Sequence, residues 1–138
     1  MLLFTIPNRK TLNQIAEHSI SADSTGKELK GDNTYTLHLP PGIPASDFWS
    51  VIVYDSQTRL MIHAGQPWPS VHRNCKKLMF NPEGSLDIWF GPEPLPGKEN
   101  NWVQTIRGKR WYLILRLYDP LESWFNVTWK PGDIEEVK

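Results

Sequence analysis

The chain has little that could cross-link it, hold a metal through sulfur or draw it to nucleic acid. Its single cysteine, Cys75, has no partner for an intrachain disulfide and cannot build a thiolate metal site alone. Lys plus Arg number 15 and Asp plus Glu number 15, so the formal net charge is zero. No nucleic-acid partner is expected, because binding nucleic acid requires a basic excess that displaces counterions.

Long apolar runs are also missing. No stretch reaches the ~18 consecutive apolar residues of a membrane-spanning helix, and no basic block is suited to a membrane surface. The opening segment, MLLFTIPNRK, is too short for the core of a signal peptide and has no basic region before it. The sequence therefore predicts no membrane partner, and a cytoplasmic location is the default expectation.

Turn residues and aromatic side chains are abundant. The 138 residues fit one domain. Twelve Pro and nine Gly divide the chain into short segments, and aromatic residues make up 12% of it. Short aromatic and β-branched segments between frequent turns are typical of β-proteins. The composition therefore predicts a single all-β domain.

Two periodic patterns locate the expected strands. In Asn33–Leu39 and Ser85–Phe90, apolar residues alternate with polar ones, as in a strand with one buried face. Phe48–Tyr54 and Trp111–Tyr118 are apolar on both faces, which indicates strands covered on both sides. Arg59–Ala64 is expected to return beside Phe48–Tyr54 as the second strand of a hairpin.

Weaker signals complete the expected elements. Trp102–Ile106 is interpreted as a short edge strand, and a helical turn is expected from Asp119 to Trp124. Thr11–His18 is interpreted as a short helix, because Thr11 and Gln14 have the spacing of a capping box.

Together these elements predict an antiparallel two-sheet sandwich of jelly-roll type. We expect the sandwich to occupy residues 24–138 and an N-terminal arm or short helix to occupy residues 1–23.

Three longer blocks carry a family resemblance: YTLHLPPGIPASDFWSVIVYD, PEGSLDIWFGPEPLPGKENNWVQT and WYLILRLYDPLESWFNVTWKPGDIE. From about Ser24 to the C-terminus the chain resembles the family called domain of unknown function 1214. That family usually forms the C-terminal half of longer bacterial proteins whose N-terminal half is domain of unknown function 1254. The resemblance implies a jelly-roll-like β-sandwich and no established activity. We expect no companion N-terminal domain within this sequence.

Polar residues next to a Pro- and Gly-rich loop carry the first binding hypothesis. Asn101 and Gln104 flank Trp102, and amides beside an aromatic ring can hydrogen-bond a polar ligand while the ring stacks on it. The alternative is that these amides tie down irregular backbone, which needs partners wherever it is buried.

Arg116 extends this hypothesis because it interrupts an apolar strand. A buried guanidinium has to be paired, and Asp55, Asp87 and Glu99 are its candidate partners in the sequence. The alternative is the carboxylate of a ligand, which suits the fork geometry of arginine. We therefore predict a ligand-binding surface built from Asn101, Trp102, Gln104 and Arg116.

Two tryptophans are candidates for an exposed platform. Trp68 lies between two prolines in a loop, and Trp89 faces away from the apolar side of its strand. Exposed indoles in jelly-roll modules often stack on sugars, so Trp68 is added to the predicted ligand-binding residues. The alternative is that the tryptophans belong to the core.

The sequence offers little for catalysis or metal binding. There is no G-x-S-x-G nucleophile elbow, and the four His residues lack H-x-H or H-E-x-x-H spacing. No metal and no cofactor are predicted. Paired carboxylates remain open, since their separation depends on the fold. The strand-end acids are Asp47, Asp55, Asp87, Glu99 and Asp119.

The sequence leaves three functions open. The first is a non-catalytic ligand-binding or assembly module, with a small polar ligand as its partner. The second is an uncharacterised hydrolase-like enzyme with strand-end carboxylates. The third is a structural domain that forms homo-oligomers through an exposed sheet face, which an apolar face would favour.

Overall fold

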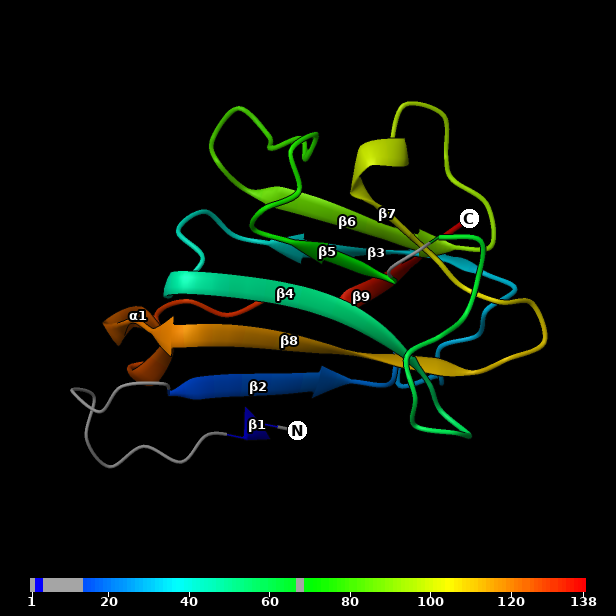
Figure 1. Cartoon of the computed structure of the whole chain (residues 1–138), viewed down its shortest axis with the longest axis horizontal. Coiled ribbons are helices and arrows are strands. Elements are labelled where there is room, and N and C mark those ends of the chain that lie inside the picture. The colour runs from blue at the N-terminus through cyan, green and yellow to red at the C-terminus, as the bar shows by residue number, and fades with distance from the viewer. Residues whose placement is uncertain (1, 4–13, 67–68) are drawn as a thin grey trace.

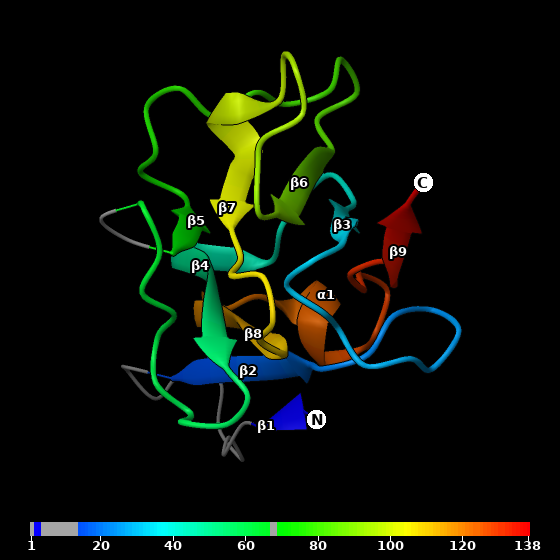
Figure 2. The same ribbon diagram turned by 90° about the vertical axis from the view of Figure 1, so that its right-hand side faces the viewer.

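The computed structural model describes residues 2–3, 14–66 and 69–138, which build two stacked β-sheets with a short helix at one end (Figure 1). The five-stranded sheet runs, in spatial order, β1 (Leu2–Leu3), β2 (Ile15–Ile20), β8 (Trp111–Pro120), β4 (Ala45–Asp55) and β5 (Ser70–His72). The four-stranded sheet runs β7 (Trp102–Gln104), β6 (Leu86–Gly91), β3 (Thr34–Leu39) and β9 (Ile134–Val137). Figure 2 shows the two layers from the side. The predicted all-β sandwich is confirmed.

The alternating strands bury the predicted faces. Tyr35, Leu37 and Leu39 of β3 are each at most 1% exposed, and Leu86, Ile88 and Phe90 of β6 are completely buried. Between the sheets, the ring of Trp111 is 1% exposed and lies 5.7 Å from that of Tyr35 and 5.0 Å from that of Phe90, measured between centroids. Trp111 therefore joins the two layers at the centre of the core.

The predicted N-terminal helix is wrong over the part of it that the structure describes. Residues 15–20 form strand β2, which pairs antiparallel with β8 from Ile15 beside Tyr118 to Ile20 beside Leu113. Pairing with a long apolar strand outweighs a local capping signal of about 1 kcal/mol. Residues 15–20 of the predicted arm therefore belong to the five-stranded sheet, and Thr11 lies outside the described residues.

The predicted hairpin partner of β4 is formed only in part. Arg59–Ala64 is no regular strand, but Met61 forms an antiparallel bridge with Tyr54, and the amide of Ile62 donates to the carbonyl of Val53 at 3.2 Å. The antiparallel neighbours of β4 are β8 and the three-residue strand β5. Asp55 holds the turn after β4 by accepting hydrogen bonds from the backbone amides of Gln57 and Thr58. Its own amide donates to the carbonyl of Leu60 at 2.8 Å, so the chain returns beside the end of β4.

The smaller sheet is mixed rather than purely antiparallel. β7 pairs parallel to β6, with Trp102 beside Trp89, and forms the predicted edge strand. The helical turn expected near Trp124 is the helix α1 (Glu122–Phe125). Within the described part of the chain, no helix is long and apolar enough to cross a bilayer.

Candidate functional site

Asn101 lies in the 3-10 helix Glu99–Asn101, just before β7, and is 7% exposed. Its side-chain oxygen accepts a hydrogen bond from the amide of Met79 at 2.9 Å. Its side-chain nitrogen donates to the carbonyls of Met79 at 2.7 Å and Asp87 at 2.9 Å. Asn101 thus joins loop 73–81, β6 and the start of β7, and its polar atoms are all engaged with backbone.

Gln104 and Trp102 are engaged in the same way. Gln104 accepts from the amide of Gly65 at 2.7 Å, and its own backbone amide donates to the side chain of Gln66 at 2.6 Å. The indole N–H of Trp102 donates to the carbonyl of Gly91 at 3.0 Å. These contacts fasten the edge strand β7 to the loop after β4 and to the end of β6. They leave little free hydrogen-bonding capacity for a ligand.

Arg116 lies on the other sheet, on the face turned away from the core. Its guanidinium pairs with the carboxylate of Glu17 across β2 and β8 and donates to the hydroxyl of Tyr54 at 2.8 Å. Burial opposes its charge, but the hydrogen bonds of Tyr54 and Glu17 outweigh that effect and raise the pKa of Arg116 above its ordinary value. Arg116 is therefore a paired structural cation.

The predicted ligand surface is thus divided between two places. Asn101, Trp102 and Gln104 line the β7 edge of the four-stranded sheet, whereas Arg116 belongs to the five-stranded sheet. Trp68 lies outside the described residues. Trp89 is half-buried, with the ammonium group of Lys98 5.3 Å from its ring centroid.

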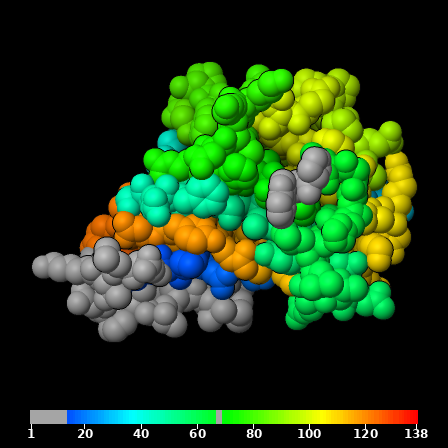
Figure 3. All heavy atoms as spheres, viewed as in Figure 1, coloured from blue at the N-terminus to red at the C-terminus, as the bar shows by residue number. Residues whose placement is uncertain are grey.

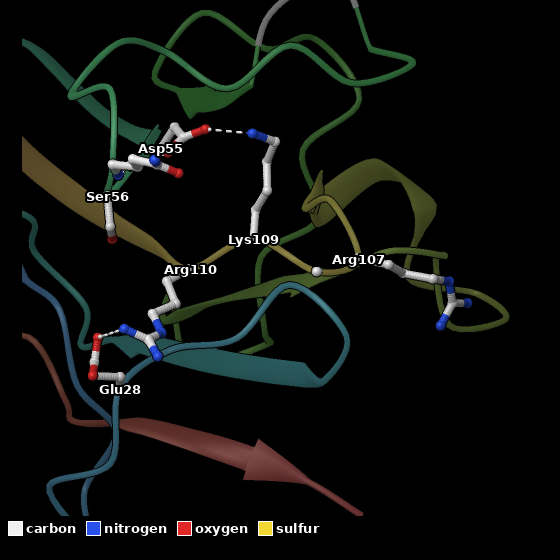
Figure 4. Close-up of a pocket in the computed structure, with 8 residues that line it drawn as sticks. Glu28, Asp55, Ser56, Arg107, Lys109 and Arg110 are labelled. Carbon is white, nitrogen blue, oxygen red and sulfur yellow. Dashed lines mark hydrogen bonds and ion pairs between the residues drawn. The ribbon is translucent and has the colours of Figure 1, made fainter.

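A pocket of about 770 Å³ lies at the end of β4 beside the turn Arg107–Arg110. Figure 4 shows Lys109 extending to Asp55, and Arg110 lying beside Glu28. The nitrogen–oxygen distances are 3.1 Å for the first pair and 3.6 Å for the second. Arg107, the third cation of the lining, pairs with Glu93 at 2.9 Å. Each of the three cations of this pocket therefore has an acidic partner within the chain.

Asp55 is the most constrained acid of this pocket. The backbone N–H of Gln57 is the main cause that lowers the pKa of Asp55, and Lys109 adds to the effect. A carboxylate with a lowered pKa stays ionised and suits a structural role better than that of a general acid.

The other strand-end acids with assigned contacts are also engaged by neighbours. Asp87 contacts His38 at 2.7 Å and Asn81 at 3.1 Å. Asp119 accepts from the hydroxyl of Ser46 at 2.5 Å. Among the described residues, no three His, Cys, Asp or Glu side chains are grouped as metal ligands would be.

The outer face of the five-stranded sheet carries a different kind of surface. Strand alternation turns Trp49, Val51 and Val53 of β4 into the core, so the residues between them point outward. We define the outer face by the six apolar or aromatic residues of β4 and β8 that point away from the core: Phe48, Ile52, Tyr54, Tyr112, Ile114 and Tyr118.

Cross-strand contacts organise this outer face. Ile52 lies beside Ile114 in the centre, and the rings of Tyr54 and Tyr112 stack with centroids 5.3 Å apart. Phe48 contacts Tyr118 edge to face at 5.6 Å. All but Tyr112 are partly exposed, and Figure 3 shows β4, β8 and β2 forming a continuous surface toward the viewer.

The sequence contains the pattern that produces this surface, but the pattern predicts burial of both faces. Apolar residues on both faces of Phe48–Tyr54 and Trp111–Tyr118 indicate strands that are covered on both sides. In the described structure, the second sheet covers one side only. The inner residues form the core, and the outer ones form a broad half-buried surface.

Comparisons with known proteins give two similar solved structures and one family. It is similar to the crystal structure of the VPA0106 protein from Vibrio parahaemolyticus, with a TM-score of 0.77 and 21% identity over 90% of this chain and 31% of that one. It is also similar to an uncharacterised protein from Burkholderia cenocepacia, with a TM-score of 0.50 and 19% identity over 91% of this chain and 29% of that one. No curated protein matches the chain.

The chain thus spans less than a third of the length of these two solved structures, and the likeness concerns the fold. Residues 15–122 match the family described as "Protein of unknown function (DUF1214)". Since this match covers most of the sequence, the chain belongs to the DUF1214 family.

Proposed function

We propose that the chain is a non-catalytic assembly module whose outer face binds a companion domain. The observation that carries this proposal is the composition of β4 and β8. A sheet with one solvated face normally places polar residues on that face. Here, six outward positions are apolar or aromatic, and the polar ones are Ser50, which is 5% exposed, and the paired Arg116. A surface of this kind is typical of protein interfaces.

The contacts of the predicted ligand residues also favour assembly over polar-ligand binding. Asn101 and Gln104 use their amides to hold backbone, as described above. Asp55 and Asp119 bind neighbouring groups of the same chain. These contacts weaken the case for a hydrolase with strand-end carboxylates. The outer face, by contrast, has mostly apolar and aromatic side chains whose exposed parts have no described partner.

The size of the outer face suits one part of an interface. Strands rise about 3.3 Å per residue and lie about 4.8 Å apart, so Phe48–Tyr54 across the two strands β4 and β8 spans roughly 23 by 10 Å. That is about 220 Å², roughly a quarter of what one partner contributes to a standard interface. We infer that neighbouring loops supply the remaining area.

We further propose that the partner is domain of unknown function 1254, which accompanies this family in longer bacterial proteins. Most of each solved structure that matches this chain lies outside the matched part, which gives room for such a domain. The jelly-roll type of the sandwich belongs to the same proposal, and it is supported by the predicted strand pattern and by the family resemblance.

The test is to measure binding of this chain to the part of the Vibrio parahaemolyticus protein outside the matched third, by titration calorimetry. Replacing Ile52 and Ile114 together by Lys places two charges in the centre of the face. We expect the dissociation constant to rise more than about thirtyfold, since about 2 kcal/mol or more of apolar burial is lost.

The matched control is Met79→Lys, because Met79 is 56% exposed and lies in a loop outside the outer face. It should bind as tightly as the unaltered chain. Self-association of the unaltered chain that the double variant abolishes would favour the homo-oligomer instead. A monomer that binds nothing would contradict the proposed function.

A further inference from the structure

A second pocket, of about 470 Å³, lies between β2 and the segment that joins α1 to β9. His18 of β2 and Trp124 of α1 contribute to its lining. Val127, Trp129 and residues 130–133 complete it.

The walls of this pocket are aromatic, and its rim is charged. Trp124 and Trp129 are 8% and 5% exposed, so both rings are held firmly. Pockets of roughly 300–1,000 Å³ with apolar walls and a few polar groups are typical small-molecule sites. The size and lining of this pocket therefore match a compact, flat, apolar ligand.

Two polar features restrict the chemistry of that ligand. The indole N–H of Trp124 is buried and has no acceptor among the described residues, whereas that of Trp129 donates to the carbonyl of Pro40 at 3.0 Å. A buried donor without a partner costs about 1–3 kcal/mol, which a ligand oxygen would offset. Lys130 is exposed at the rim and has no assigned ion pair within the described chain.

His18 and Asp133 are the other polar groups of the pocket. Burial lowers the pKa of His18 below its ordinary value of 6.5, so its ring is neutral near pH 7. Asp133 is exposed at the rim and opposes an anion there. The positive charge that faces the pocket therefore comes from Lys130.

We propose that this pocket binds small aromatic carboxylates, with the ring against the exposed edges of Trp124 and Trp129 and the carboxylate near Lys130. Edge-to-face aromatic pairs of this kind gain energy beyond that of simple burial. The N–H of Trp124 is buried, so a carboxylate oxygen would accept from it after the Trp124 side chain shifts toward the pocket. This site is separate from the outer face, so either proposal can fail alone.

The test is a titration of the full chain with 2-naphthoate, followed by nuclear magnetic resonance of the ¹⁵N-labelled indole N–H groups. Trp124→Phe assigns the signal of Trp124. We expect a dissociation constant near about 1 mM for a ligand of this size. The Trp124 signal should move downfield as its N–H gains an acceptor, and the Trp129 signal should move with the same dissociation constant.

Charge variants then test the orientation of the ligand. Lys130→Glu should weaken 2-naphthoate binding about threefold or more, whereas Asp133→Asn should strengthen it, as expected for rim charges. Neither variant should alter binding of the neutral analogue 2-naphthalenemethanol. Lys77→Glu is the matched control, since Lys77 is an exposed loop residue outside the pocket, and it should leave binding unchanged.

Two results would overturn the proposal. The first is that neither indole signal moves at a naphthoate concentration well above the expected dissociation constant. The second is that Lys130→Glu and Lys77→Glu have equal effects, which would remove the carboxylate from the rim of this pocket.

Discussion

Replacing Asn101 by Ala separates a structural role for this residue from a ligand-binding one. The change removes three hydrogen bonds, to the amide and carbonyl of Met79 and to the carbonyl of Asp87. Each bond contributes about 0.5–1.5 kcal/mol net, and the buried groups left behind lose their partner. We therefore expect the free energy of unfolding to fall by about 2–4 kcal/mol.

Urea denaturation followed by circular dichroism measures this loss of free energy. Thermal unfolding gives a second measure: a domain of 138 residues loses roughly 3 °C of Tm per kcal/mol, so the Tm should fall by about 6–12 °C. Asn100→Ala is the matched control, since Asn100 is the exposed neighbour in the same 3-10 helix. Its free energy of unfolding should change by less than about 0.5 kcal/mol.

A loss for Asn101→Ala no larger than that for Asn100→Ala would refute this reasoning. It would mean that the three contacts contribute little to folding, and that Asn101 is held in place for a purpose other than stability. Hydrogen exchange at the amide of Met79 gives an independent check, because this amide should exchange faster in Asn101→Ala.

Three further predictions concern the backbone and one buried charge. Asp55→Asn should lower stability by about 1 kcal/mol at pH 7. The folded-state pKa of Asp55 lies below 3.8. The difference in the free energy of unfolding between the unaltered chain and Asp55→Asn should therefore be largest above pH 3.8 and should disappear as the pH falls through the folded-state pKa. Urea denaturation at several pH values measures this difference. Gly31→Ala should cost at least about 3 kcal/mol or prevent folding, since the added carbon would lie 1.8 Å from the carbonyl oxygen of Ile106; a Tm within a few degrees of the unaltered chain would contradict the tight contact. Val127→Asn should raise the Tm slightly, because Val127 is 60% exposed and adopts a φ of 60°, which Asn tolerates better; a lower Tm would show that its methyl groups contribute more than the strain costs.

Much of the fold can be predicted from the order of apolar and polar residues within single strands. The alternation in β3 and β6 and the apolar run of β8 place Leu37, Ile88 and Leu115 in the core, and the structure buries each to 1% or less. By contrast, β2 was predicted as a helix because its burial depends on pairing with β8, about a hundred residues later. β5 has three residues, too few for any periodic signal.

The candidate site was predictable only in part, because its partners are distant in sequence. The sequence identifies Asn101 as a polar side chain beside an aromatic residue. It does not identify the hydrogen-bond acceptors of Asn101, which are the backbone carbonyls of Met79 and Asp87. Arg116 was expected to pair with a strand-end acid. Its carboxylate partner is Glu17. Glu17 is not among the predicted partners because its segment is predicted as a helix and not as a strand beside β8.

The most direct test of the proposed assembly role is hydroxyl-radical footprinting, which reads the exposure of aromatic side chains. It would compare this chain alone with the same chain mixed with the companion part of the Vibrio parahaemolyticus protein. Labelling of Phe48, Tyr54 and Tyr118 should fall severalfold in the complex, whereas Phe80, which is 52% exposed in a loop outside the outer face, should be unchanged. Equal labelling of the three outer-face rings in both samples, with a complex present, would contradict docking at this sheet.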